Sequence, residues 1–189
     1  MSWCASALSA ALMLAVTLVA GSPAAARPLN IVAIGASNTT GFGVGAAQAY
    51  PAVLQALLRK RGIDANVANA GVNGDVTAGM LRRIDSAVPK GTDIVILQPG
   101  GNDLRFFGTK EARAANIAAM EKRVRARGIR VVVYDPPTIP ADFYQWDHIH
   151  FNAAAHAKIA ATLAAQIAAM VKPKGAPLPA APPRAPAKP

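Results

Sequence analysis

Four short runs of mostly apolar residues recur along the middle of the chain, and a helical pattern follows each of them. The runs are "LNIVAIG" from Leu29, "ANVANAG" from Ala65, "TDIVILQPGG" from Thr92 and "IRVVVYD" from Ile129. Nearly continuous apolar runs of this length are typical of strands buried on both faces of a parallel sheet. Successive parallel strands need right-handed crossovers, which place helices on both faces. The sequence therefore predicts a three-layer α/β/α sandwich with a parallel sheet of about four to five strands.

The helical patterns cover residues 48–62, 76–88, 110–128 and 152–171. The first ends in basic residues and Gly62, and the third stops at Gly128, both of which are helix stop signals. Asn152 is a natural N-cap for the last helix. In open parallel sheets, binding sites form at the carboxyl ends of the strands, so the loops after the four runs are the places to search for function.

The two ends of the chain differ in composition from its middle. Residues 1–26 contain no charged side chain, and an apolar run of 13 residues from Leu8 to Ala20 precedes the small residues Ala24–Ala26. This pattern predicts a cleaved signal peptide and an exported protein, periplasmic or secreted, although no basic residue precedes the run. The alternative is an uncleaved N-terminal anchor.

Residues 172–189 are rich in Pro, Ala and Lys, and they predict a disordered tail or a semi-rigid spacer. Such a basic tail either contacts an anionic surface or only keeps the protein soluble. Residues 27–171 remain, which is enough for one domain.

The formal net charge is +10, but the basic residues are spread over helix ends. No aromatic-studded basic strand accompanies them, so we expect no nucleic-acid partner. The single cysteine, Cys4, lies in the predicted signal peptide, which leaves no disulfide or thiol chemistry to argue for. Oligomeric state stays open.

Polar residues suited to acyl transfer follow each of the four runs. A serine hydroxyl is a weak nucleophile until an imidazole accepts its proton, and the imidazole needs a carboxylate partner. Ser37 is the candidate nucleophile, His150 the base, and Asp147 lies three residues before that base, within reach of one turn. The backbone N–H groups of Ser37 and Gly74 and the amide of Asn102 are the candidate oxyanion donors.

These residues resemble the four sequence blocks of the GDSL, or SGNH, hydrolases. The blocks are "GASNTTG" with Ser37, "NAGVNGDVT" with Gly74, "GGND" with Asn102 and "DHIHFN" with Asp147 and His150. The resemblance implies a flavodoxin-like fold and hydrolysis of esters or thioesters through an acyl-enzyme, with no metal or organic cofactor. Across the family the substrates are small-molecule or polymer esters, including lipids and acetylated sugars.

The chain departs from the family pattern at three places. Ala36 and Asn38 flank the serine, which predicts the loss of the local hydrogen bonds that the family's aspartate makes. His148 stands where the family usually has a small residue. Asn102 and Asp147 are only 45 positions apart, which predicts a reduced lid and an open, shallow site.

Other interpretations of the same residues stay open at this point. Ser37 could be a helix cap, and Asp147, His148 and His150 are metal-ligand types, although no Cys or Glu cluster supports a metal. The stretch "GFGVGA" mimics a dinucleotide fingerprint but does not follow its strand directly.

The aromatic residues that border the last block, Phe143, Tyr144 and Trp146, are expected to bind substrate, with core packing as the alternative. Asp75 and Asp103 are expected to hold loops, and His156 to be structural. A catalytically silent domain that binds cell-wall or lipid surfaces is the rival functional hypothesis.

Overall fold

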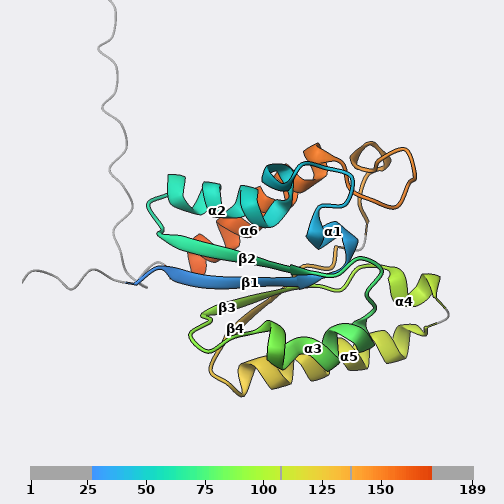
Figure 1. Ribbon diagram of the computed structural model, residues 1–189, viewed down its shortest axis with the longest axis horizontal. Coiled ribbons are helices and arrows are strands. Elements are labelled where there is room, and N and C mark those ends of the chain that lie inside the picture. The colour runs from blue at the N-terminus through green and yellow to red at the C-terminus, as the bar shows by residue number, and fades with distance from the viewer. Residues whose placement is uncertain (1–26, 107, 137, 172–189) are drawn as a thin grey trace, which may run out of the picture.

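A parallel sheet of four strands forms the middle layer of the computed structural model, which describes residues 27–106, 108–136 and 138–171 (Figure 1). The predicted signal peptide 1–26 and the predicted tail 172–189 therefore lie outside the described residues. The strands are β1 Leu29–Gly35, β2 Ala65–Gly71, β3 Ile94–Gln98 and β4 Arg130–Val133. They are ordered β2-β1-β3-β4, and every neighbouring pair is parallel. The predicted parallel sheet is confirmed, with four strands.

The helices connect the strands and mostly keep the expected positions. They are α1 Ser37–Thr40, α2 Tyr50–Lys60, α3 Thr77–Ala87, α4 Asn102–Arg105, α5 Lys110–Arg125 and α6 Ala153–Val171, with short 3-10 turns η1 Ala46–Gln48 and η2 Ala141–Phe143. The helix predicted over 48–62 begins at Tyr50, where Pro51 occupies a first-turn position that needs no backbone N–H. Asn152 accepts the Ala155 N–H at 3.1 Å, as expected of an N-cap.

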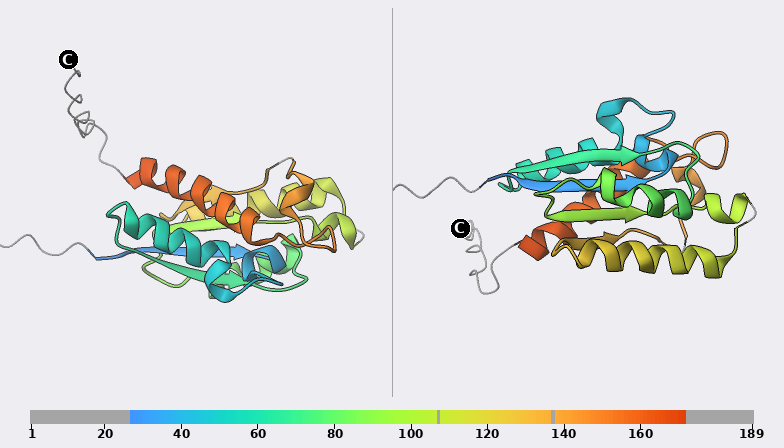
Figure 2. Two further views of the ribbon diagram at one scale, coloured as in Figure 1. Left: turned by 90° about the horizontal axis from the view of Figure 1, so that it is seen from above. Right: turned by 60° about the horizontal axis from the view of Figure 1, so that its bottom comes forward.

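Two separate cores lie on the two faces of the sheet, because successive strand side chains point to opposite sides. On one face, Ile31 and Ile96 pack with α2 and α6. On the other face, Val32 and Leu97 pack with α3 and α5. Figure 2 shows α2 beside α6 from above and α3 beside α5 from below. The predicted three-layer sandwich is therefore confirmed.

Helix α6 is long and apolar enough, by length and composition alone, to cross a membrane. Its apolar side instead packs into the core of this domain. Ile159, Leu163 and Ile167 are buried among the residues of α2 and the sheet. We interpret α6 as a core helix.

The sheet has a switch point between β1 and β3. From β1 the chain crosses by α2 to β2 on one side, whereas β3 and β4 lie on the other side. The loops after β1 and β3 therefore part from each other and open a crevice at the carboxyl edge.

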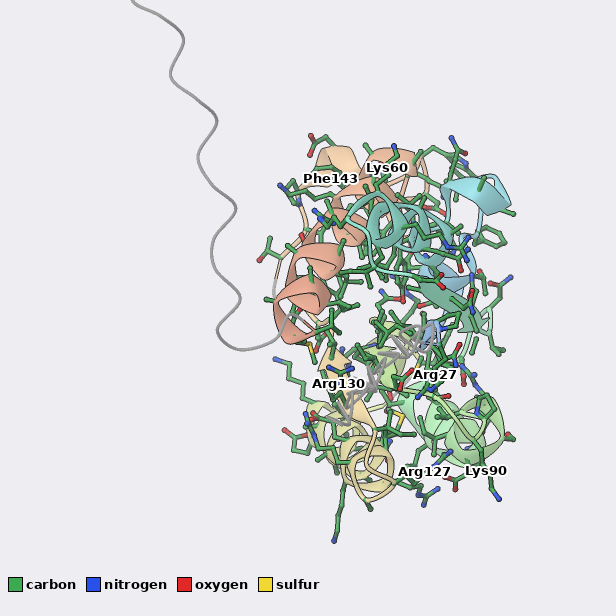
Figure 3. All side chains as sticks on the ribbon, turned by 90° about the vertical axis from the view of Figure 1, so that its left-hand side faces the viewer. Arg27, Lys60, Lys90, Arg127, Arg130 and Phe143 are labelled. Atoms are coloured by element: carbon green, nitrogen blue, oxygen red, sulfur yellow. The ribbon has the colours of Figure 1, made fainter. Side chains whose placement is uncertain are left out.

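Basic side chains gather at the opposite, amino-terminal edge of the sheet. Figure 3 shows Arg27, Lys60, Lys90, Arg127 and Arg130 around that edge. The large positive net charge of the chain therefore says little about the charge of the crevice, which has to be judged from its own residues.

Candidate active site

Ser37 stands where β1 ends, as the first residue of the four-residue helix α1. The turn into α1 requires Gly35, since a Cβ there would lie 2.6 Å from the Gln98 carbonyl oxygen and would also clash with Thr39. Ser37 is 8% exposed. Its backbone N–H, like that of any first helical residue, has no acceptor within the helix. A hydroxyl and a free N–H are thus presented together at the crevice.

Asp147 and His150 form a close pair in the loop before α6. The Asp147 Oδ2 to His150 Nδ1 distance is 2.5 Å. Asp147 Oδ1 accepts the backbone N–H groups of Ile149 and His150, each at 2.9 Å. Hydrogen bonds from the backbone and ring of His150, followed by the Ile149 N–H, hold the pKa of Asp147 well below its usual range. The carboxylate stays ionised and leaves Nε2 as the free ring nitrogen.

Asn38 connects this loop to the serine. Its Oδ1 accepts the backbone N–H of Phe151 at 2.8 Å, and its Nδ2 donates to the Ile149 carbonyl at 3.4 Å. The His150 ring packs on the Phe42 ring with centroids 4.4 Å apart. The Ser37 hydroxyl and the His150 ring are not themselves hydrogen-bonded in the described chain. Sequence reasoning expected the aspartate's hydrogen bonds to be lost at Ala36, and it did not foresee that Asn38 makes two long-range ones.

Asn102 and Gly74 come from the loops after β3 and β2. The Asn102 amide donates one hydrogen to the Asp75 carbonyl at 2.9 Å, and an amide carries two hydrogens, so the second is free. Gly74 has a φ of 75°, and a Cβ built there would meet nothing within 4 Å. The positive φ at position 74, and not a lack of room for a side chain, therefore explains the glycine.

The expected loop-holding roles of Asp75 and Asp103 are confirmed. Asp103 accepts the backbone N–H of Thr77 and, at 2.5 Å, its hydroxyl, and so caps α3 from another loop. Asp75 pairs with Arg83 at 2.8 Å, and Arg83 also donates to the carbonyls of Ala70 and Gly35. These contacts fix the carboxyl ends of β1 and β2 relative to α3.

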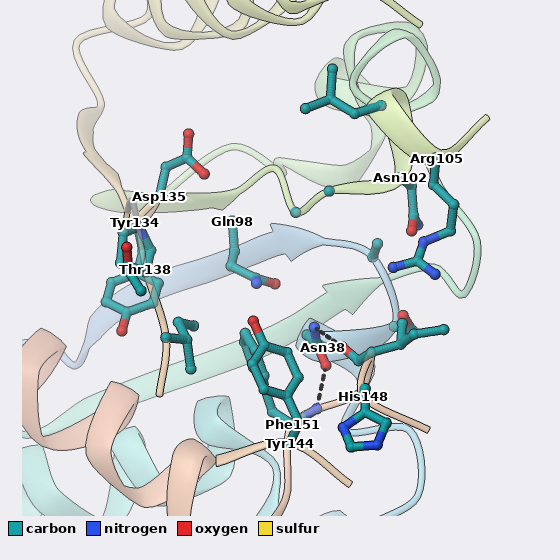
Figure 4. A pocket seen from close by; sticks show the side chains of 18 of the residues that line it. Asn38, Gln98, Asn102, Arg105, Tyr134, Asp135, Thr138, Tyr144, His148 and Phe151 are labelled. Carbon is teal, nitrogen blue, oxygen red and sulfur yellow. Dashed lines mark hydrogen bonds between the residues drawn. The ribbon is translucent and has the colours of Figure 1, made fainter. Parts of the chain in front are cut away.

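A groove of about 420 Å³ opens between α4 and the loop before α6. Ser37, Asn102, Tyr144 and His148 line it, together with Arg105 (Figure 4). Neither Gly74 nor His150 lines this groove. Of the proposed catalytic and oxyanion residues, Ser37 and Asn102 thus line the groove, whereas Gly74 and His150 lie outside its lining.

Of the three aromatic residues expected to bind substrate, only Tyr144 lines the groove. Phe143 packs against the core on the α2–α6 face. Trp146 is 89% exposed. The reason is local: Tyr144 forms a bridge with Phe151 that turns it inward, and the neighbours on either side face elsewhere.

One exposed apolar side chain, that of Leu104, lines the groove. Within the described residues, the exposed large hydrophobic residues all lie in segments that follow the carboxyl ends of strands or precede α6: Phe42, Val72, Leu104, Phe106 and Trp146.

His148 has a φ of 57°, the only positive value among the described non-glycine residues. This left-handed conformation gives a physical reason for a small residue in the family pattern. In the described parts of the chain, no cluster of three or more His, Cys, Asp or Glu residues could hold a metal.

The remaining histidine, His156, is structural, as expected. Its side chain is fully buried, and its Nδ1 accepts the Tyr50 N–H at 3.2 Å at the start of α2. Burial lowers the pKa of His156 to about 4.

Sequence reasoning missed two residues, Arg83 and Arg105, and it missed the tethering function of Asn38. Each acts on a partner or a cavity formed by a distant segment, so no local pattern marks it. The only local signal was that Arg105 follows Asn102 by three positions, which places both on one side of a helix.

These features define an α/β protein of the three-layer class with a polar site at the switch point of its sheet. The chain belongs to the GDSL-like lipase/acylhydrolase family, whose model matches residues 33–184. It is accordingly a GDSL-type enzyme that acts on ester bonds.

Two curated relatives agree with this assignment. Esterase TesA of Pseudomonas aeruginosa is 32% identical over 143 residues, which cover 72% of this chain and 70% of that protein. An arylesterase of Vibrio mimicus is 29% identical over 106 residues, which cover 55% of this chain and 52% of that protein.

Solved structures share the fold. A crystal structure of TesA covers 75% of this chain and 99% of its own, with a TM-score of 0.68 and 21% identity. Esterase EstA from Pseudoalteromonas sp., in a structure inhibited by monoethylphosphonate, covers 75% of this chain and 98% of its own, with a TM-score of 0.65 and 18% identity.

Proposed function

We propose that this protein is an exported serine esterase that cleaves carboxylic esters through Ser37, His150 and Asp147. The observation that carries the proposal is the Asp147–His150 pair, which Asn38 joins to the helix of Ser37 by two hydrogen bonds. Catalytic hydrogen bonds often tighten only when substrate is bound, and the proposal requires that the tethered loop then brings His150 onto the hydroxyl.

In the first half of the reaction, Nε2 of His150 takes the proton of Ser37 as the hydroxyl attacks the ester carbonyl. Asp147 holds the proton on Nδ1 and stabilises the imidazolium that forms. The negative charge that develops on the carbonyl oxygen is met by the N–H groups of Ser37 and Gly74 and by the free amide hydrogen of Asn102.

In the second half, His150 gives its proton to the leaving alcohol and then activates water. Water attacks the acyl-enzyme at the same carbonyl, and the same donors hold the second oxyanion. The acid leaves and Ser37 recovers its proton. No step requires a group beyond these side chains and backbone amides.

The groove supports esters of modest size or esters held at the end of a larger molecule. It is open, and Tyr144 and the exposed Leu104 are among the residues that line it. Small acyl, lipid and acetylated-sugar esters fit this description. Export rests on the composition of residues 1–26, and a basic tail that contacts an anionic surface stays a prediction.

Replacement of the nucleophile tests the mechanism directly. Ser37→Ala should abolish turnover of 4-nitrophenyl butyrate while the circular dichroism spectrum stays that of the unchanged protein, because the substitution removes one small polar atom. The matched control is Ser86→Ala, which changes an exposed serine of α3 and should keep full activity.

Labelling by an organophosphonate ester separates the enzyme from a silent binding domain. We expect one covalent label, at Ser37, in the unchanged protein and in Ser86→Ala, and none in Ser37→Ala. Full turnover by Ser37→Ala, or an intact protein that takes up no label and cleaves no ester, would contradict the proposal.

A further inference from the structure

One cationic side chain in the groove has no acidic partner. Arg105 lies on α4, three residues after Asn102, so both side chains project from one side of the helix. Figure 4 shows both directed toward the loop that carries His148. Arg105 lines the groove, is exposed, and forms no ion pair in the described chain.

The other arginine of the groove is neutralised. Arg113 makes a bidentate pair with Asp135 at 2.7 and 2.9 Å and donates to the Gly100 carbonyl at 2.8 Å. Asp135 is the one acidic residue among the groove-lining residues, and this pair uses both of its oxygens. No acidic residue that lines the groove is therefore available to pair with Arg105.

No acidic residue outside the described segments can compensate Arg105. All ten Asp and Glu residues lie between Asp64 and Asp147, in the described part of the chain. Asp103, next along the helix from Asn102, is buried and committed to Thr77. The residues that line the groove therefore carry a net positive charge beside Ser37.

We infer that Arg105 binds a negatively charged group of the substrate, so that this esterase prefers esters that bear an anion close to the scissile bond. This inference rests on the proposed function and names the substrate class of the same site. A guanidinium offers several N–H donors in a planar fork, which matches the oxygens of a carboxylate or a phosphate.

Geometry sets where the anion lies. If Asn102 holds the carbonyl oxygen, Arg105 is its neighbour one turn along the helix, and residues three apart on a helix have Cβ atoms roughly 5–6 Å apart. The anion then sits only a few bonds from the ester. Leu104 and Tyr144, which also line the groove, would contact the uncharged part, which makes the preferred substrate amphiphilic.

The test compares charged and neutral esters in two matched pairs. Mono-4-nitrophenyl adipate against 4-nitrophenyl hexanoate places the carboxylate on the acyl side. 4-Carboxyphenyl acetate against 4-acetylphenyl acetate places it on the alcohol side. For each pair, the ratio of charged to neutral kcat/KM is compared between variants, which cancels the intrinsic reactivity of the esters.

In Arg105→Gln, we expect the ratio to fall by about fivefold or more in at least one pair, as for the loss of one partly solvated ion pair. Arg105→Lys keeps the charge and should lose about twofold or less. The control Arg61→Gln removes an exposed charge at the far end of α2 and should leave both ratios unchanged. Raising salt from about 0.05 to 0.5 M should lower the ratio of the unchanged enzyme.

The inference is wrong if Arg105→Gln keeps both ratios within about twofold of the unchanged enzyme at low salt, where such ion pairs are strongest. That outcome leaves the esterase proposal intact, since all four esters would still be cleaved. If the unchanged enzyme cleaves none of them faster than Ser37→Ala does, the proposed function fails and this inference fails with it.

Discussion

At the scale of single residues, Asn38 links the segment of Ser37 to the loop that carries the other two proposed catalytic residues. Asn38 comes directly after Ser37, yet its two partners lie more than 110 positions away along the chain. We expect it to act through the loop of Asp147 and His150, as a positioning residue. The amide suits this task because it donates and accepts at once.

Asn38→Ala should lower kcat by about tenfold, because a small displacement of a catalytic group is costly. The free energy of unfolding should fall by about 1–2 kcal/mol as the Phe151 N–H loses its acceptor. Asn38→Asp keeps that acceptor and should recover part of both losses. Esterase kinetics and urea denaturation measure the two effects, and a kcat within twofold of normal in Asn38→Ala would exclude the positioning function.

At the scale of elements, neighbouring strand-end loops are cross-linked by side chains rather than by backbone pairing. Asp103 follows β3 but caps α3, which follows β2. Asn102, beside it, donates to the Asp75 carbonyl in the same neighbouring loop. One dipeptide therefore fixes the distance between two of the proposed oxyanion donors.

Asp103→Ala should lower the free energy of unfolding by about 2–3 kcal/mol, because the buried N–H and hydroxyl of Thr77 lose their partner and α3 loses its cap. Asp103→Asn retains one acceptor and should lose less. Asp64→Ala, at an exposed site, should change stability by less than about 0.5 kcal/mol. Equal denaturation midpoints for Asp103→Ala and Asp64→Ala would refute this cap.

At the scale of the whole molecule, His156 joins α6 to the start of α2 inside one core. Its Nδ1 accepts the Tyr50 N–H, which puts the proton of the neutral ring on Nε2, a buried atom without a partner in the described chain. The rings of Tyr50 and Phe151 enclose it. Charging this imidazole is unfavourable, in agreement with its pKa of about 4.

The stability of the protein should therefore decrease on acidification between about pH 6.5 and pH 4. In this window the unfolded chain binds a proton at His156 and the folded chain does not, so the free energy of unfolding decreases as the pH falls, by about 3 kcal/mol in total. His156→Asn keeps an acceptor for the Tyr50 N–H and should remove this part of the pH dependence. Urea denaturation at several pH values checks the slope, and identical slopes in the two proteins would contradict it.

Much of the fold could be predicted from the sequence, because it depends on patterns within short segments. The Val- and Ile-rich runs predicted the four strands, and the spacing of Ile117, Met120 and Val124 predicted α5. The i,i+3 spacing of Asp147 and His150 predicted their contact, since one turn of chain suffices to form it. The orientation of Phe143 and Trp146 could not be predicted in this way, because the direction in which a loop side chain points depends on what packs around the loop.

What the sequence by itself determined is the order of the elements, the parallel sheet and the edge at which the polar residues collect, because periodicity and strand direction are properties of short segments. Only the tertiary structure decided that Asn38 holds the loop of His150, that Arg83 ties β1 and β2 to α3, and that Arg105 faces a groove without a counter-charge. Each of those facts depends on segments far apart in the chain lying within a few ångströms, and that closeness arises from packing two helical layers on one twisted sheet.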